Sequence, residues 1–479
     1  MQEHRPLFEY IVKLQNMSEN RQAAMELGTE RVRKLLIQYA VPAIIAMTAS
    51  SLYNMVDSIF IGHGVGPLAI SGLALTFPLM NLAAAFGSLV GVGAATLISM
   101  RLGQRDYQTA GTVLGNVVVL NLIIGVVFGV LALAFLDPIL YFFGASADTI
   151  SYAREYMTVI LAGNVITHMY LGLNAVLRAA GHPRKSMYAT IMTVVINTVL
   201  DPLFIYGFDW GIRGAAIATV LAQIISLVWQ LRILSNKNEL LHFRRGIYRL
   251  RGSLVRDILA IGMSPFLMNL AACFIVILIN RSLAIYGGDL SIGAYGIVNR
   301  LGFFFVMIVM GINQGMQPIA GYNYGSRQYG RVLQALRLTI LGATCITSLG
   351  FLIGELMPKT VVALFTTDEE LIRLSAEGMR ITFACFPIIG FQMVATNFFQ
   401  SIGMAWKAIV LSLSRQLLFL LPCLLVLPPL FDSYTEWSGS LGVWCAMPVS
   451  DFLASVVAFF MLTHQLRNFK GRIARSEKQ

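Results

Sequence analysis

Long apolar runs, separated by short polar breaks, dominate the pattern of side chains along this chain. A helix that crosses the hydrocarbon core of a bilayer needs about 20 mostly apolar residues. Transmembrane strands do not fit, because they run for only about 9–11 alternating residues. The pattern therefore predicts an all-α membrane protein with twelve spans, at 35–62, 67–98, 110–136, 150–177, 187–207, 212–233, 256–285, 290–319, 333–356, 374–399, 408–430 and 439–465.

The sequence also repeats itself at a long interval. Gly103 is echoed by Gly325 (325 − 103 = 222), and Pro42 by Pro265 (265 − 42 = 223). The echoes fall at equivalent ends of equivalent spans, and six spans per half preserve orientation, so a parallel repeat is expected. The predicted organisation is an N-terminal segment 1–34, an N-lobe 35–234, an inter-lobe loop 235–253, a C-lobe 254–465 and a basic tail 466–479.

Positive charge is unevenly divided between the loops. Most Lys and Arg residues outside the spans follow even-numbered spans, whereas the loops after odd-numbered spans hold few and are rich in Asp and Glu. Cytoplasmic loops carry the excess of Lys and Arg, so both termini are predicted to be cytoplasmic. This rule also accounts for the net charge of +11, and we expect no nucleic-acid partner.

Composition agrees with a membrane protein, since 57% of the residues are hydrophobic and 12% are charged. Soluble domains are about 45–50% apolar and about 25% charged. The five cysteines stand singly in apolar stretches without a CxxC motif, so they are expected to be buried and unpaired. His63, His168 and His464 are isolated in the sequence, and no metal site is predicted.

Two aspartates lie inside predicted spans of the N-lobe. Asp57, Asp201 and Thr219 fall at a similar depth, roughly 8–11 Å below the outer surface at 1.5 Å per residue. Asn197 precedes Asp201 by one helical turn and shares its face. Such a group predicts a site that shares a proton or binds a small cation with oxygen ligands. The alternative is that Asp201 only caps the backbone break at Pro202.

The C-lobe does not repeat these carboxylates, because Asn280 stands where Asp57 would be (280 − 57 = 223). Arg300, about ten residues into the eighth span, is expected either to line a cavity or to form an ion pair. Met307 belongs to a run of Phe and Met residues that suits a flexible wall for varied ligands.

Three further features have structural interpretations. Glu377 and Arg380 lie on one helix face and are expected to pair with each other. Arg415 and Asp451 are candidates for an ion pair between spans. Pro42 is expected to kink the first span, and a kink of this kind is a candidate hinge.

Five sequence motifs, spread over nearly the whole chain, belong together. They are Leu52-Tyr-Asn-Met-Val-Asp57-Ser-Ile-Phe, Gly172-Leu-Asn174-Ala-Val-Leu-Arg178-Ala-Ala-Gly181, Asn197-Thr-Val-Leu-Asp201-Pro202-Leu-Phe-Ile, Gly214-Ala-Ala-Ile-Ala-Thr219 and Gly315-Met-Gln-Pro318-Ile-Ala-Gly-Tyr-Asn323-Tyr-Gly325. Through these motifs the chain resembles the multidrug and toxic compound extrusion (MATE) transporters, in particular their bacterial multidrug branch.

The resemblance implies a twelve-helix, two-lobe antiporter in the plasma (inner) membrane of a bacterium. It would expel amphipathic, often cationic compounds by using a proton or sodium gradient, with no cofactor besides that coupling ion. It implies small-molecule and lipid partners and a monomer. The implied positions are Asp57, Asn197, Asp201 and Thr219 for the cation, Tyr53 and Asn174 for an N-lobe polar cavity, and Asn280, Arg300, Met307, Gln314, Gln392 and Asn397 for a C-lobe cavity.

Other classes of protein fit less well. A lipid-linked oligosaccharide flippase of related design would need a strongly cationic cavity, and only Arg300, Arg281 and Arg415 are available. An intramembrane enzyme is not favoured, because the sequence holds no paired catalytic motif. A scaffolding protein would give no reason to keep two buried aspartates.

Overall fold

The computed structural model describes residues 25–434 and 439–476, and within these residues every regular element is a helix. Most helices are long and follow the apolar runs of the sequence. Their bounds are α2 Val32–Gly64, α3 Pro67–Gly103, α4 Tyr107–Ala134, α5 Leu136–Phe142, α6 Ile150–Ala162, α7 Asn164–Ala179, α8 Pro183–Pro202, η1 Leu203–Gly207, α9 Gly211–Ser235, α10 Gly252–Gly325, α11 Tyr329–Leu356, α12 Pro358–Val362, α13 Glu369–Phe383, α14 Phe386–Ser401, α15 Ala405–Leu413, η2 Ser414–Leu420, α16 Leu421–Tyr434 and α17 Gly439–Ser476.

The described helices account for the predicted spans. Ten are long and apolar enough to cross a membrane, and two further pairs fit when each bent pair is counted as one span, which makes twelve. The bent pairs are α6 with α7, at 56°, and α13 with α14, at 52°. They correspond to the predicted fourth and tenth spans. The long α10 holds two spans, which turn at Gly288, a residue with φ 68°.

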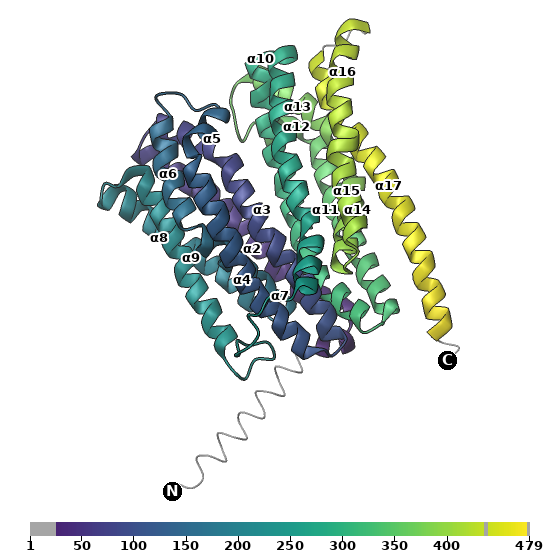
Figure 1. The fold of residues 1–479 in the computed structure, drawn as a ribbon. Coiled ribbons are helices and arrows are strands. Elements are labelled where there is room, and N and C mark those ends of the chain that lie inside the picture. Colours follow the sequence, from purple (N-terminus) through teal and green to yellow (C-terminus); the bar gives the residue numbers. More distant parts are fainter. Residues whose placement is uncertain (1–24, 435–438, 477–479) are drawn as a thin grey trace.

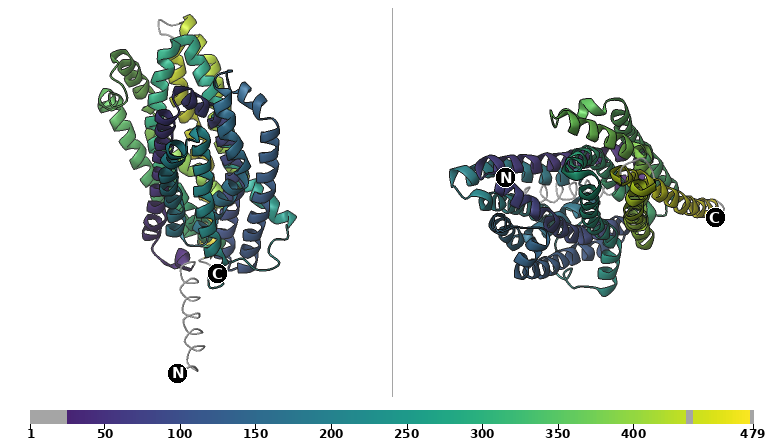
Figure 2. Two further views of the ribbon diagram at one scale, coloured as in Figure 1. Left: turned by 90° about the vertical axis from the view of Figure 1, so that its left-hand side faces the viewer. Right: turned by 90° about the horizontal axis from the view of Figure 1, so that it is seen from above.

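Two groups of helices, from the two halves of the chain, stand side by side (Figure 1). Elements α2–α9 form one group and α10–α17 the other, and both groups are visible from the end of the bundle in Figure 2. We call the end at which α2 begins and α17 ends the terminal end. The two groups of helices diverge toward the opposite end (Figure 1).

Tight turns at the terminal end occur at matching places in the two halves. Arg105 and Arg327 both have positive φ, of 60° and 62°, and lie 222 residues apart (327 − 105). Gly181 and Gly403, also 222 residues apart (403 − 181), have φ of 97° and 74°. Glycine suits this left-handed region because it has no Cβ to collide with the backbone. The parallel repeat itself stays a prediction.

Small residues allow the two halves to pack backbone against backbone near the terminal end. A Cβ placed on Gly262 of α10 would lie only 1.7 Å from the carbonyl oxygen of Leu89 in α3. A Cβ on Gly103 would similarly lie 2.0 Å from the carbonyl oxygen of Tyr322. Close helix contacts in membranes depend on such small residues. Both sites are therefore expected to tolerate no larger side chain in this packing.

Polar side chains join the halves in the same region. Gln317 of α10 donates to Thr96 Oγ1 of α3 at 2.9 Å. Asn323 donates to the carbonyl oxygen of Leu27 at 2.8 Å and is fully buried. Buried amides that find partners across an interface fix its register.

Several predictions differ from the structure. Glu377 pairs with Arg373 at 3.2 Å, whereas Arg380 donates to the carbonyl oxygen of Glu355, so the expected Glu377–Arg380 pair is wrong. An alternative basic residue one turn earlier on α13 competes for Glu377. The cysteines are free but not buried, since Cys345 is exposed and the other four are half-buried.

The predicted terminal segments are described only in part. Residues 1–24 of the N-terminal segment 1–34 and residues 477–479 of the tail 466–479 lie outside the described residues. The remainder of the tail is not a separate segment, because α17 continues through it to Ser476.

Candidate functional site

The carboxyl groups of Asp57 and Asp201 meet inside the N-terminal half, where α2 packs against α8. Asp57 is 5% exposed and Asp201 is completely buried. Asn197, one turn earlier on α8, donates from Nδ2 to Oδ1 of Asp201 at 2.8 Å. The structure thus brings together three of the four residues predicted to hold a cation.

Three oxygens of this group are buried without a hydrogen bond from another group in the described part of the chain: Asp57 Oδ1, Asp201 Oδ2 and Asn197 Oδ1. Buried polar atoms without partners are costly, and most protein structures hold few of them. Oxygens are also the ligands that hard cations prefer. The arrangement suits an occupant that brings positive charge, either a proton between the two carboxyls or a small cation.

Hydroxyl groups form the next layer of the site. Thr219 of α9 donates to the carbonyl oxygen of Ala215 and lies 3.0 Å from the hydroxyl of Tyr53 on α2. Tyr156 of α6, 1% exposed, interacts with Thr219 and with both carboxyls. We name Asp57, Asp201, Asn197, Thr219, Tyr53 and Tyr156 the carboxyl site.

Tyr156 was missed from the sequence, where it reads as one more aromatic residue of an apolar run. Its depth would have been a signal. It lies six residues after Ile150, the start of its span, which is about 9 Å at 1.5 Å per residue. That is the same depth as Asp57, Asp201 and Thr219.

The end of α8 is wound in a way that presents Asp201 to α2. Pro202 lacks a backbone N–H and follows Asp201 directly, and the π-helical segment η1 begins at the next residue. Within η1, Tyr206 donates to the carbonyl oxygen of Phe60 on α2 at 2.9 Å. Single π-helical turns recur at functional sites because they re-aim side chains. Here the turn closes α8 against α2 just beyond the carboxyls.

Asn174 belongs to a different group, nearer the terminal end. Its Nδ2 donates to Thr190 Oγ1 at 3.0 Å, and its Oδ1 accepts from Ser186. Thr190 and Asn197 are seven residues apart on α8, or about 10 Å. Asn174 and Tyr53 thus have different hydrogen-bond partners, and an N-lobe polar cavity shared by the two stays a prediction.

A cavity of about 210 Å³ lies beside Asn174 and is lined by helices of both halves. Pro42 and Gln314 contribute to its wall, and Gln314 lies 3.5 Å from the sulfur of Met47. Arg178 also lines it and donates to Ser186 at 3.0 Å. The hinge role of Pro42 stays a prediction.

Within the described residues, the hydrogen bonds of the residues expected in a C-lobe cavity go to other partners, and the cavity stays a prediction. Gln392 is buried and lies within 3.5 Å of Thr396 Oγ1 and of the carbonyl oxygen of Leu411. Asn397 donates to Met393 of its own helix. The remaining members lie elsewhere on α10, where Asn280 and Met307 are half-buried and Arg300 is exposed. Gln314 is the member that joins the other half, as described above.

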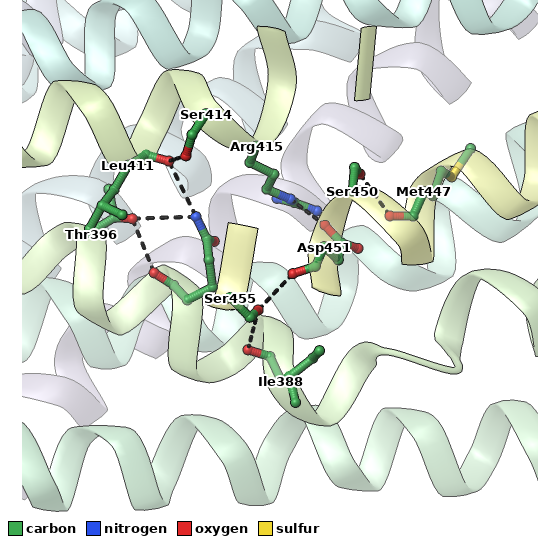
Figure 3. Close-up of polar contacts among 10 residues, drawn as sticks. Ile388, Thr396, Leu411, Ser414, Arg415, Met447, Ser450, Asp451 and Ser455 are labelled. Atoms are coloured by element: carbon green, nitrogen blue, oxygen red, sulfur yellow. Dashed lines mark hydrogen bonds and ion pairs between the residues drawn. The ribbon is translucent and has the colours of Figure 1, made fainter. Parts of the chain in front are cut away.

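One charged pair is buried in the C-terminal half. Arg415, the second residue of η2, donates from Nε to Oδ1 of Asp451 on α17 at 2.5 Å (Figure 3). Asp451 is 4% exposed, and Ser455 donates to its backbone carbonyl at 2.7 Å. The expected pairing between these two spans is confirmed. We name this group the arginine–aspartate pair.

Among the described residues, no group of three or more His, Cys, Asp or Glu side chains is placed to hold a metal ion. His168 is buried instead against the carbonyl oxygen of Ala83, at 2.9 Å from its Nε2. The carboxyl site has two acidic members, Asp57 and Asp201.

Curated relatives resemble this chain over most of its length. The multidrug export protein MepA of Staphylococcus haemolyticus is 28% identical over 435 residues, which is 91% of this chain and 94% of that protein. MepA of Staphylococcus aureus is 26% identical over 90% of this chain and 93% of its own length. Both relatives are export proteins, so the prediction that this chain is not an enzyme is confirmed.

Solved structures share the fold. The outward-facing conformation of a multidrug resistance MATE family transporter superposes with a TM-score of 0.86 at 25% identity, over 94% of this chain and 99% of that one. MATE in the bent conformation gives a TM-score of 0.88 with the same identity and coverage. The predicted fold class, an all-α membrane protein of MATE-like architecture, is confirmed.

The family model MatE matches two segments of the chain, residues 42–203 and 265–425. The segments begin 223 residues apart (265 − 42), the interval at which the sequence echoes occur. Together they cover more than half of the chain. On this match, the chain belongs to the MatE family, the multidrug and toxic compound extrusion (MATE) transporters.

Proposed function

We propose that this protein exports amphipathic, often cationic compounds by antiport, coupled to the entry of protons or sodium ions. The observation that carries the proposal is the carboxyl site, where Asp57 and Asp201 meet with three unpartnered oxygens. The names of the relatives, which are multidrug export proteins, support the choice of substrates.

The carboxyl site suits an exchange of one positive charge. Two carboxylates in a medium of low polarity repel each other, so the site is stable only when a proton or cation lies between them. A proton would be shared by Asp57 and Asp201. A sodium ion would take oxygens from Asp57, Asp201, Asn197 and Thr219, all hard ligands. Release of the ion leaves the site unstable, and that instability can favour the conformation in which a new ion enters.

The packing between the halves supports alternating access. Backbone-to-backbone contacts at Gly103 and Gly262 hold the halves together near the terminal end. We propose that the terminal end is cytoplasmic, following the distribution of Lys and Arg. In this arrangement the path to the cytoplasm is closed, and rocking of one half against the other would open it.

The flippase alternative is not favoured. Of the three arginines that were candidates for a cationic cavity, Arg415 is neutralised by Asp451. Arg281 and Arg300 are exposed on α10. A pyrophosphate-bearing substrate would need several basic groups that converge on one place.

Export by purified protein in liposomes tests the proposal, with the pH gradient and the sodium gradient imposed independently. We expect one of the two gradients to drive the accumulation of a cationic dye. Asp57→Asn should abolish this accumulation. Asp148→Asn is the matched control, because Asp148 is exposed on a loop. Dye accumulation by Asp57→Asn at the wild-type rate would contradict the role of the carboxyl site.

A further inference from the structure

A pocket of about 530 Å³ lies at the terminal end, between the inter-lobe loop and the first turns of α4. Four basic side chains line it, and Glu239 is the acidic member of the lining. Uncharged donors complete the wall. The residues that matter here are Lys237, Arg244, Arg245 and Arg251 on the loop side, and Tyr107, Gln108 and Thr112 on α4.

The acidic groups near the pocket are already engaged. Glu239 accepts from Lys185 at 2.6 Å and lies 2.7 Å from Nε2 of His182. Burial opposes its ionisation, but the hydrogen bonds and charges of His182 and Lys185 outweigh burial and lower the pKa of Glu239 to about 2. Asp106, which caps α4 through the N–H of Thr109, interacts with both Arg251 and Arg101. The lining therefore keeps an excess of positive charge.

The loop that supplies these arginines is fixed on α4. Asn116 of α4 is fully buried and donates to the carbonyl oxygens of Ile247 and Arg249. Its own oxygen accepts from the N–H of Arg251 at 3.2 Å. The guanidinium of Arg244 lies over Gly111, where a Cβ would come within 3.1 Å of it. The loop backbone is thus fixed on α4, and the four basic side chains, although exposed, stand around one pocket.

This placement exceeds what membrane topology requires. Positive charges that orient a protein need only to stand on one side of the membrane. Arg232 and Arg256 flank the same loop and are exposed like the four basic residues of the pocket, but they do not line it. The four basic residues differ from them in their position around one pocket, not in exposure.

The surroundings of the pocket resemble a membrane interface. Tyr248 and Leu250, on either side of Arg249, are 44% and 41% exposed. Tyr248 stacks on Phe243 with ring centroids 6.5 Å apart. Aromatic and apolar side chains beside arginines are typical of the level at which lipid headgroups lie. A soluble anion would not need these exposed apolar neighbours.

We propose that this pocket binds the phosphate-bearing headgroup of an anionic phospholipid, with Arg244, Arg245, Arg251 and Lys237 around the phosphate and Tyr248 and Leu250 against the lipid. Arginine binds phosphate through paired N–H donors, and basic pockets on the cytoplasmic side of membrane proteins hold such headgroups. The loop leads directly into α10, the first helix of the second half. A lipid bound between this loop and α4 would therefore contact both α4 and the connection between the halves.

Binding to purified protein in detergent tests this site, with native mass spectrometry as the readout. The probes are short-chain phosphatidylglycerol, phosphatidylcholine with the same chains, and inorganic phosphate. Wild type should bind phosphatidylglycerol at least about tenfold more tightly than phosphatidylcholine. Arg244→Gln/Arg245→Gln should remove this preference and leave the binding of phosphatidylcholine unchanged. A higher salt concentration should weaken the binding of phosphatidylglycerol but not of phosphatidylcholine, because salt screens interactions between exposed charges.

The matched control is Arg33→Gln/Arg256→Gln, which removes the same charge from two exposed arginines outside the pocket. It should bind phosphatidylglycerol as wild type does. Equal losses in both double variants would assign the preference to overall charge and overturn the site. Inorganic phosphate that binds as tightly as phosphatidylglycerol would overturn the assignment to lipid. If Arg244→Gln/Arg245→Gln does not fold, Lys237→Gln, an exposed position, should still weaken phosphatidylglycerol a few-fold, and no change would count against the proposal.

Discussion

Both halves of this transporter contain buried aspartates, but the side chains next to these aspartates differ in charge. In the N-terminal half, the polar neighbours of Asp57 and Asp201 in the described residues are uncharged, and no basic side chain pairs with either carboxyl. In the C-terminal half, Asp451 lies against Arg415. Both regions adjoin a π-helical segment, η1 in the first and η2 in the second.

This difference indicates which of the two buried groups requires a bound proton or cation to balance its charge. The arginine–aspartate pair is already neutral, so it can stay buried without any further charge. The carboxyl site has at least one negative charge too many unless a proton or cation enters. If transport is ion-coupled as proposed, the driving ion is therefore expected to bind in the N-terminal half.

The largest expected effect is that of neutralising Asp201. Asp201→Asn should lose ion-driven accumulation altogether, because the site no longer needs a positive charge to be stable. Asp57→Asn/Asp201→Asn should lose no more than either single variant, since both residues serve one site. Transport in proteoliposomes at matched protein content gives the measurement.

The competing explanation for Asp201 makes the opposite prediction. If Asp201 only caps the break at Pro202, an amide oxygen can still accept the backbone bond and Asp201→Asn should stay active. Near-normal rates would remove Asp201 from the carboxyl site and leave Asp57 to act alone.

Breaking the arginine–aspartate pair should affect stability rather than coupling. Asp451→Asn leaves the charge of Arg415 without its partner, at a cost of about 3 kcal/mol in the free energy of unfolding. This is the lower end of the range for buried pairs, because the Arg415 side chain is 33% exposed. Thermal unfolding in detergent measures the loss.

Two further measurements connect this variant to the comparison. Arg415→Met/Asp451→Leu, which removes both charges, should recover most of the lost stability. The dependence of transport on the driving ion should be unchanged in the folded fraction of Asp451→Asn. A changed ion dependence would mean that the C-terminal half also takes part in coupling.

Tyr156→Phe should have a smaller effect, confined to ion affinity. It removes one hydroxyl from the carboxyl site and keeps the ring that fills the space around it. A neutral hydrogen bond contributes about 0.5–1.5 kcal/mol, so the apparent affinity for the driving ion should fall by roughly 2–10-fold. Initial rates at varied ion concentration measure this, with Tyr295→Phe, a buried tyrosine of the other half, as the control.

Much of the fold could be predicted from the sequence because membrane spans are set by length and hydrophobicity. The twelve predicted spans correspond to ten helices and two bent pairs. The bends themselves, at Gly163 and at Ala384–Cys385, were not predicted. Neither position is a proline, and neither lies in a polar break of the sequence. Packing against neighbouring helices, which a single sequence does not display, determines such bends.

The site was predicted in part for a similar reason. Depth along a span is readable from residue counts, and it grouped Asp57 with Asp201, which meet in the structure, and with Thr219, which lies in the layer around them. Rotation about the helix axis and the neighbours of each helix are not readable in this way. Asn174 and the predicted C-lobe set were grouped by chemistry, and in the structure Asn174 and Asn397 bond to other partners.

The smallest expected effect concerns Glu239 at the terminal end. Like Asp451, Glu239 lies against basic side chains that balance its negative charge. His182 and Lys185 lower its pKa to about 2, against burial that acts in the opposite direction. A lowered pKa in the folded state stabilises the protein above the unfolded value of about 4.3, and this stabilisation is lost as the pH falls from there toward 2. Between pH 5.5 and pH 4, the loss should be about 0.6 kcal/mol.

Glu239→Gln isolates this contribution, because it removes the ionisable group and keeps the shape of the side chain. The stability difference between wild type and Glu239→Gln should shrink by that amount when the pH falls from 5.5 to 4. Starting at pH 5.5 limits the titration of histidines, since an ordinary imidazole has a pKa of about 6.5. Thermal unfolding of both proteins at the two pH values gives the measurement. A stability difference that stays constant between the two pH values would mean that His182 and Lys185 do not hold Glu239 ionised. The contrast between paired and unpaired acids would then apply only to the buried aspartates.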